Sequence, residues 1–165
     1  MKRSIHAYMG LALGFLIASS NYYILPYTIL SGWLGGWFPD LDLKYRHRKG
    51  LHNLIAAMVF TSFIYIASYA LYSKFLLLTR DSPLYISLAF IGGYILHLFF
   101  DSLTPRGIYV LYPLSKKCLR IASFRSDGLF INALGFLIAS TIIAIWLIKY
   151  TGFNIYLKIL LQSLK

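Results

Sequence analysis

Residues 84–103 read LYISLAFIGGYILHLFFDSL, and this stretch decides the class of the protein. His97 and Asp101 are its only histidine and its only charged residue, and nearly all the other side chains are apolar. A helix of this length is about 30 Å long, which matches the hydrocarbon thickness of a bilayer. The stretch therefore predicts a membrane-spanning helix with two ionisable side chains near one end.

The rest of the chain has the same apolar character. Charged residues make up only 13% of the 165 residues, whereas soluble domains carry about a quarter. We therefore expect an all-α, polytopic membrane protein with about four to six membrane helices, forming a single integral membrane domain over residues 1–165. The other apolar stretches lie at 5–20, 27–38, 54–78, 129–148 and 153–164. We expect the last of these to return through part of the membrane or to lie in its interface.

The first 38 residues allow two topologies. Asn21 and Pro26 mark a turn, so this stretch forms either one long kinked span or a tight helical hairpin. Gly10, Gly14 and Ala18 recur every four residues, a pattern typical of a helix that another helix approaches closely. The hairpin also brings His6 to the membrane face that holds the other histidines. We therefore predict the hairpin.

Basic residues are concentrated on one side of this topology. The chain has 16 lysines and arginines but only five acidic residues, all aspartates. One face receives Lys2, Arg3, Lys44, Arg46, Arg48, Lys49, Arg106, Lys116, Lys117, Arg120 and Arg125, and the other keeps Lys74, Arg80 and Lys149. The positive-inside rule then places the first face in the cytoplasm and the protein in the plasma or inner membrane. We expect these cations to contact membrane lipids and not nucleic acid. The oligomeric state stays open.

His97 and Asp101 are the first candidates for a functional site. They are four residues apart on a helix and therefore share a face. Ionisable groups at membrane depth are costly, and their presence indicates a function with a partner nearby. The alternative is a His–Asp pair that satisfies itself and fixes helix packing.

Asp40 and Asp42 form a second candidate pair. Pro39 ends the preceding helix, and alternation along an extended segment would aim both carboxylates the same way. Carboxylates combined with histidines suit Zn²⁺, Mn²⁺ or Fe²⁺ and can bridge two metal ions. The alternative is a helix cap or a solvated turn, which accounts for most loop aspartates.

The polar loop that follows supplies two further histidines. His47 and His52 flank Arg48, Lys49 and Gly50. Nearby positive charge disfavours protonation of imidazole, and neutral imidazole is the form that binds metal. His52 opens a long helix and is the better candidate, while His47 fits an interfacial basic loop equally well.

The combination of these residues is more specific than any one of them. Eight of the nine histidines and aspartates fall at one membrane face, and Asp81 is the exception. At these residues the chain resembles the YdjM-like, LexA-regulated family of membrane-bound metal-dependent hydrolases. The resemblance runs from His6 to about Pro113 and rests on His6 with Gly10, Pro39-Asp40-Leu41-Asp42, His47-Arg48 with His52, Gly93-Tyr94 with His97, and Asp101-x-x-Thr104-x-x-Gly107.

This resemblance implies a helical membrane protein with a metal-dependent hydrolytic site. The ligand pattern also resembles that of zinc phospholipases C, which implies phosphoester chemistry by analogy. The family's stretch His-Arg-Gly-x-Thr/Ser-His reads His47-Arg48-Lys49-Gly50-Leu51-His52 here, with the glycine displaced by one position. The family's later acidic position is usually Glu, and Asp127 is the residue that can stand in for it.

We therefore predict a hydrolase that cleaves a phosphoester of an anionic lipid or lipid-linked substrate at the cytoplasmic interface. The expected ligands of one or two divalent ions, Zn²⁺ or Mn²⁺, are His6, Asp40, Asp42, His52, His97 and Asp101. Asp42, Arg48 and Asp101 are expected to take part in catalysis. Asp42 would bridge ions or orient a ligand histidine, and Arg48, with Lys49 and Arg106, would hold the anionic group. The alternatives are a non-catalytic metal-binding scaffold and, less favoured, a small transporter.

Overall fold

The computed structural model describes residues 1–44, 50–72, 74 and 79–151. These residues form α1 (Arg3–Ala18), α2 (Leu25–Trp37), the 3₁₀ helix η1 (Phe38–Lys44), α3 (Leu54–Tyr72), α4 (Ser82–Ser102) and α5 (Leu129–Tyr150). The predicted all-α class is confirmed, and α3, α4 and α5 are each long and apolar enough to cross a membrane. The apolar stretch 153–164 and most of residues 73–78 lie outside the described residues.

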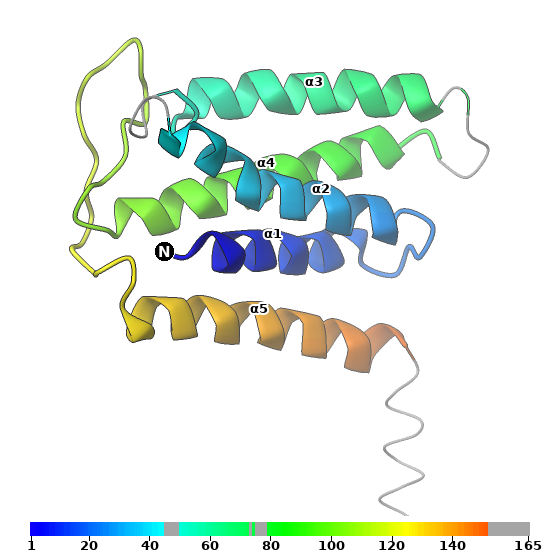
Figure 1. Ribbon diagram of the computed structural model, residues 1–165. Helices are drawn as coiled ribbons and strands as arrows, with labels where there is room; N and C mark the ends of the chain where they lie inside the picture. The colour runs from blue at the N-terminus through cyan, green and yellow to red at the C-terminus, as the bar shows by residue number, and fades with distance from the viewer. Residues whose placement is uncertain (45–49, 73, 75–78, 152–165) are drawn as a thin grey trace, which may run out of the picture.

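Consecutive helices run antiparallel (Figure 1). They are not all neighbours in space, because α1 packs against α2, α4 and α5, while α4 packs against α1, α2 and α3. One end of the bundle, which we call the proximal end, holds the starts of α1, α3 and α5, the end of α4, and η1. The opposite, distal end holds the connections 19–24 and 79–81. Residues 5–38 therefore form the predicted hairpin and not a single span. Pro26 lies in the first turn of α2, where its missing N–H is tolerated.

Glycines bring α1, α2 and α4 into backbone contact. A Cβ atom added to Gly10 would lie 2.1 Å from the carbonyl oxygen of Gly32, and one added to Gly36 would lie 2.3 Å from that of His6. From α4, a Cβ atom added to Gly93 would lie 2.4 Å from the same Gly32 oxygen. No side chain fits at these positions, so the small-residue stripe predicted for α1 is a packing seam. The seam places His6 and the end of α4 beside the last turn of α2.

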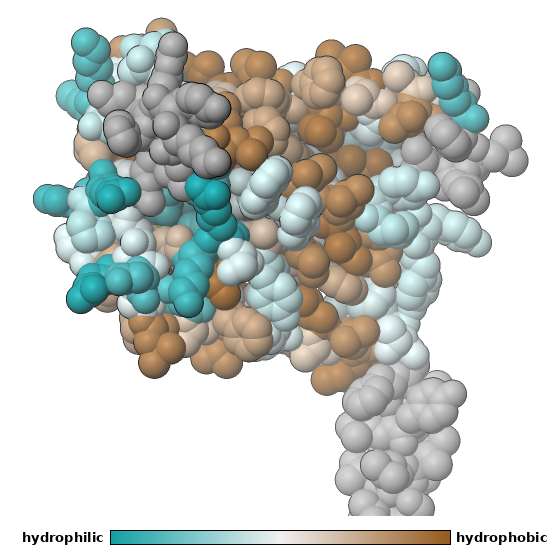
Figure 2. All heavy atoms as spheres, in the orientation of Figure 1, coloured by the Kyte–Doolittle hydropathy of each residue, from teal (hydrophilic) through white to brown (hydrophobic). Residues whose placement is uncertain are grey.

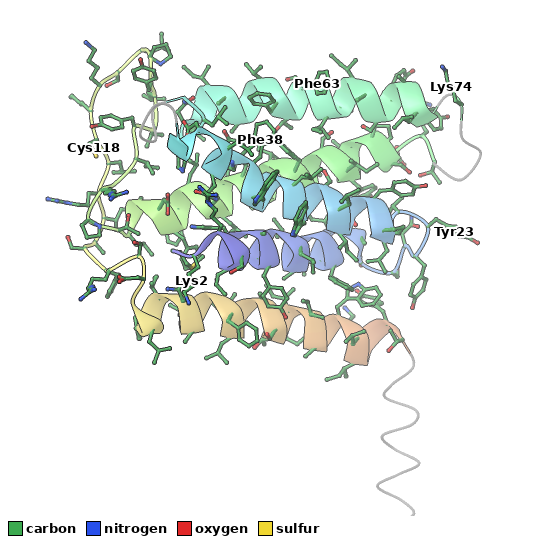
Figure 3. All side chains as sticks on the ribbon, in the orientation of Figure 1. Lys2, Tyr23, Phe38, Phe63, Lys74 and Cys118 are labelled. Carbon is green, nitrogen blue, oxygen red and sulfur yellow. The ribbon has the colours of Figure 1, made fainter. Side chains whose placement is uncertain are left out.

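Apolar side chains cover the flanks of the bundle. Phe63, Ile66 and Leu137 are among the large apolar residues that are more than 60% exposed. Figure 2 shows apolar residues across the middle of the visible face and the most hydrophilic residues gathered mainly at the proximal end. In Figure 3, Lys2 lies at the proximal end and Lys74 at the distal end. This distribution fits a bilayer around the helices, with the proximal cations among the lipid headgroups.

The connection 104–128 covers the proximal end. The Leu54 N–H donates to the Val110 carbonyl at 2.9 Å, which ties this connection to the start of α3. The Ile121 N–H donates to the Ser102 carbonyl at 2.9 Å, which ties it to the end of α4. The predicted basic loop is therefore a cap fastened to two helices.

Candidate metal centre

The candidate ligands come from four segments and meet inside the proximal end. They are His6 of α1, Asp40 of η1, His52 just before α3, and His97 and Asp101 of α4. Each of these residues is at most 5% exposed. Ionisable groups buried to this extent are costly unless they are paired or bind a cation. The cluster is therefore part of the interior and not of a solvated loop.

Five distances define a compact core of donor atoms. Nε2 of His52 lies 3.3 Å from Nε2 of His97. Oδ1 of Asp40 lies 3.7 Å from each of these nitrogens. Oδ2 of Asp101 lies 3.5 Å from Nε2 of His52 and 3.7 Å from Nε2 of His97. Ligands of a tetrahedral ion with bonds of about 2.0–2.2 Å lie roughly 3.3–3.6 Å apart, so the observed spacing is close to that of a metal site.

His6 extends the cluster on another side of Asp101. Its Nε2 lies 3.3 Å from Oδ1 of Asp101, and its ring stacks on that of His97 with centroids 3.9 Å apart. The donors form two groups that could each hold a metal ion, Asp40–His52–His97 and His6–His97–Asp101, and the groups share His97. Asp101 thus presents one oxygen to His6 and the other to the remaining two histidines. The arrangement could hold one ion or two neighbouring ions.

Hydrogen bonds show which nitrogen of each central histidine is available to a metal. Nδ1 of His97 lies 2.8 Å from the carbonyl oxygen of Gly36, and Nδ1 of His52 lies 3.0 Å from Oδ1 of Asp42. These oxygens only accept, so each Nδ1 carries the proton and donates it. In the neutral rings both Nε2 lone pairs then face each other across 3.3 Å, next to two carboxylates. Histidines that bind metals are held in this way by a partner on the other nitrogen.

Asp42 lies behind His52 and not among the close donors. Its Oδ1 accepts a hydrogen bond from Nδ1 of His52, the nitrogen that points away from the other donors, and its Oδ2 accepts the Leu51 N–H at 2.7 Å. Of its two predicted roles, this position fits the orientation of a ligand histidine. The predicted extended conformation is wrong, because residues 38–44 form a 3₁₀ helix. Asp40 and Asp42 consequently approach different nitrogens of His52.

The pKa values of the loop residues reflect the concentration of carboxylates. Burial by itself would lower the pKa of His52, but hydrogen bonds to three carboxylates, led by that of Asp101, raise it to about 10. Burial would raise the pKa of Asp42, but hydrogen bonds from His52 and the Leu51 N–H hold it below its usual value. The cluster therefore attracts positive charge, either as a proton on His52 or as a metal cation in its place.

A family model for the YdjM inner membrane protein matches residues 1–162. The chain belongs to this YdjM family. The resemblance found in the sequence is thereby confirmed over nearly the whole chain. Membership of the YdjM family, together with three helices of membrane-spanning length, identifies an integral membrane protein. Comparisons with curated proteins and with solved structures gave no match.

Two side chains that support the cluster were not predicted as site residues, although the motif Gly93-Tyr94 with His97 already included Tyr94. The buried hydroxyl of Tyr94 donates to the Leu51 carbonyl, next to the Asp42 contact. Nε of Arg3 lies 4.0 Å from Oδ2 of Asp40. Tyr94 precedes His97 by three residues, so helical spacing is the signal that could have found it. No sequence signal marks Arg3, because its contact depends on how α1 lies against η1.

Asp127 and Arg106 were also named as candidates from the sequence, and both are exposed. Asp127, the stand-in for the family's later acidic position, is exposed and pairs with Arg125 at 3.1 Å. It therefore supplies no ligand to the cluster. Arg106 is exposed in the cap. Three further predicted residues, His47, Arg48 and Lys49, lie outside the described residues.

Proposed function

We propose that this YdjM-family protein is a membrane-embedded, metal-dependent hydrolase that cleaves a phosphoester of a lipid or lipid-linked substrate. The observation that carries the proposal is the position of the two histidine Nε2 atoms, of His52 and His97, which lie 3.3 Å from each other and 3.5–3.7 Å from carboxylate oxygens of both Asp40 and Asp101. Both Nδ1 atoms of the two histidines are already hydrogen-bonded elsewhere, which leaves both Nε2 lone pairs for a cation.

The described residues fit a divalent metal ion. Imidazole nitrogen combined with carboxylate oxygen suits Zn²⁺ and Mn²⁺. Nδ1 of His6 and Oδ2 of Asp40 are buried and form no hydrogen bond within the described part of the chain, so further donor atoms are available. A bound ion would supply Lewis acidity and make a water molecule acidic enough to act as a nucleophile near neutral pH.

The protein's own residues would position these groups. Asp42 and the Gly36 carbonyl hold the rings of His52 and His97 in the orientation that a ligand needs. Asp101 belongs to the group with His6 and His97. Its Oδ2 also lies 3.5 Å from Nε2 of His52 in the other group, so it is the residue that would bridge two ions. The role predicted for Arg48, binding the anionic group of the substrate, stays a prediction.

The depth of the cluster supports an amphiphilic substrate. The cluster lies inside the proximal end of the bundle. Figure 2 shows the most hydrophilic residues of the visible face gathered mainly at this end, beyond the apolar flanks, which corresponds to the depth of lipid headgroups. Cations of the described residues favour the proximal end, which carries Lys2, Arg3, Arg106, Lys116, Lys117, Arg120 and Arg125. By the positive-inside rule, this imbalance favours a site that faces the cytoplasm.

The deep burial of the ligands favours one rival function. Structural metal sites are closed, whereas catalytic sites keep a coordination position open. A non-catalytic metal-binding scaffold is therefore the second candidate. A transporter has less support, because the described distal half buries hydroxyls such as those of Ser31, Ser68 and Ser82 but no histidine or charged group.

Phosphoester hydrolysis by the purified protein in lipid nanodiscs tests the proposal. Zn²⁺ or Mn²⁺ should support activity, and a chelator should remove it reversibly. Asp101→Asn should lose metal and activity but keep the fold, because asparagine has nearly the same shape as aspartate but is a neutral and weaker ligand. Asp127→Asn makes the same chemical change at an exposed position and should have no effect.

Two outcomes would count against the proposal. Full metal content with lowered stability in Asp101→Asn would make this residue structural and remove the hydrolase assignment. Stoichiometric metal without hydrolysis of any phosphoester lipid would favour the scaffold.

A further inference from the structure

A groove of about 440 Å³ runs along the hairpin between α1 and α2. One end is polar, with Arg3 and Ser4, and the other is apolar, with Leu11 and Trp33. The rings of Trp33 and Trp37 stack along it, with centroids 5.7 Å apart and planes 10° apart. Trp33 is 37% exposed, so this aromatic wall is open to the surroundings of the bundle. The groove therefore has the amphipathic profile of a lipid.

The polar end of the groove meets the metal cluster. Arg3 lies in the groove, and its Nε is 4.0 Å from Oδ2 of Asp40. The groove residue Ala7 directly follows the candidate ligand His6, and Trp37 lies three residues before Asp40. The Arg3 side chain is 52% exposed while Asp40 is 5% exposed. At this place an accessible cation stands next to a buried donor of the cluster.

We propose that this groove binds an anionic phospholipid, with Arg3 on its phosphate and the stacked indoles along its first carbons. The planar guanidinium binds phosphate oxygens in pairs, and tryptophan is enriched at headgroup depth in membrane proteins. The contact between Nε of Arg3 and Oδ2 of Asp40 is long, at 4.0 Å. Among the described residues it involves only Nε of Arg3, so the two terminal guanidinium nitrogens are available to bind the phosphate. The inference deepens the proposed function, since a phosphate bound by Arg3 lies beside the metal cluster.

The remaining groove residues fit the same occupant. Ser4 adds a hydroxyl at the polar end, and Leu11 continues the apolar wall toward the membrane interior. The hydroxyl of Tyr8 lies 3.1 Å from that of Ser140 of α5, which holds the phenol ring in place along the groove. The lipid would thus lie parallel to the helices, as lipids of the bilayer do.

Quenching of tryptophan fluorescence by brominated lipids tests the inference on the full chain in nanodiscs. The protein has three tryptophans, and Trp146→Phe restricts the emission to Trp33 and Trp37. Phosphatidic acid with brominated acyl chains is titrated into phosphatidylcholine discs, and brominated phosphatidylcholine is titrated separately. Both lipids carry a phosphate, but the choline cation offsets the charge of phosphatidylcholine, whereas phosphatidic acid keeps a net negative phosphomonoester. The charge-assisted contact with Arg3 should therefore be stronger for phosphatidic acid, and its brominated form should reach half-maximal quenching at a roughly three- to tenfold lower mole fraction.

Substitutions at Arg3 decide the cause of this preference. Arg3→Gln should abolish it, and Arg3→Lys should keep part of it. Arg120→Gln removes the same charge from an exposed residue of the cap and should leave it unchanged. Equal quenching by the two lipids, or a preference that survives Arg3→Gln, overturns the inference.

Metal content and hydrolysis measured on the same samples separate this inference from the proposed function. Bound metal without a lipid preference refutes the groove alone. A lipid preference that depends on Arg3, without hydrolysis, supports the groove and refutes the hydrolase.

Discussion

Replacing Asp42 by asparagine distinguishes a metal ligand from a residue that orients one. Oδ1 of Asp42 faces Nδ1 of His52 at 3.0 Å, and Oδ2 accepts the Leu51 N–H at 2.7 Å. Asparagine keeps the shape but has a single acceptor oxygen, so either the imidazole or the Leu51 N–H loses its partner. Loss of a partner behind a metal-binding histidine typically weakens metal affinity 10- to 100-fold, or about 1.4–2.8 kcal/mol.

Competition with a chromophoric chelator measures this affinity on the detergent-purified protein. We expect Asp42→Asn to bind zinc 10- to 100-fold more weakly but with unchanged stoichiometry. Asp127→Asn is the matched control, because the same change at an exposed residue should leave the affinity unaltered. The reasoning is refuted if Asp42→Asn binds zinc as tightly as the wild type. It is equally refuted if Asp42→Asn loses a full equivalent of metal, as we expect for Asp40→Asn.

Two further predictions concern the hairpin. Gly10→Ala should lower the free energy of unfolding in detergent by about 1–3 kcal/mol, because the added Cβ would lie 2.1 Å from a backbone oxygen. Leu16→Ala, at an exposed position of α1, is the control and should change this free energy little. Equal stability of the Gly10→Ala variant and the wild type would contradict the packing seam. In a Cys118→Ser background, Ser4→Cys and Ser126→Cys should both react with an impermeant maleimide from the cytoplasmic side, and labelling from opposite sides would contradict the hairpin.

Local patterns in the sequence predicted those features of the cluster that depend on a single helix. His97 and Asp101 share a face because they are four residues apart, and in the structure their donor atoms lie 3.7 Å apart. The small-residue stripe that includes Gly10 marked the face of α1 that packs on α2. The gathering of histidines and aspartates at one membrane face, together with the charge bias, favoured the hairpin that places His6 beside them.

Features that depend on contacts between distant segments could not be read from the sequence. The 3₁₀ conformation of residues 38–44 decides that Asp40 faces the cluster while Asp42 holds the outer nitrogen of His52. The prediction that Asp40 and Asp42 point the same way assumed an extended backbone and was wrong. The spacing of two aspartates does not reveal whether the backbone between them is extended or helical, because packing against other segments decides this. The contact of Arg3 with Asp40 likewise arises only when α1 is laid against η1.

The metal content of the purified protein tests the central claim most directly. His97 belongs to both groups of donors, so its loss should empty the site whether one ion binds or two. Elemental analysis of wild-type protein after exposure to Zn²⁺ or Mn²⁺ and removal of the excess should find about one to two ions per chain, as mixed histidine and carboxylate sites hold. The folded His97→Ala protein should retain almost none. A wild-type protein without stoichiometric metal, or a His97→Ala protein that keeps the wild-type amount, would contradict a metal centre at this place.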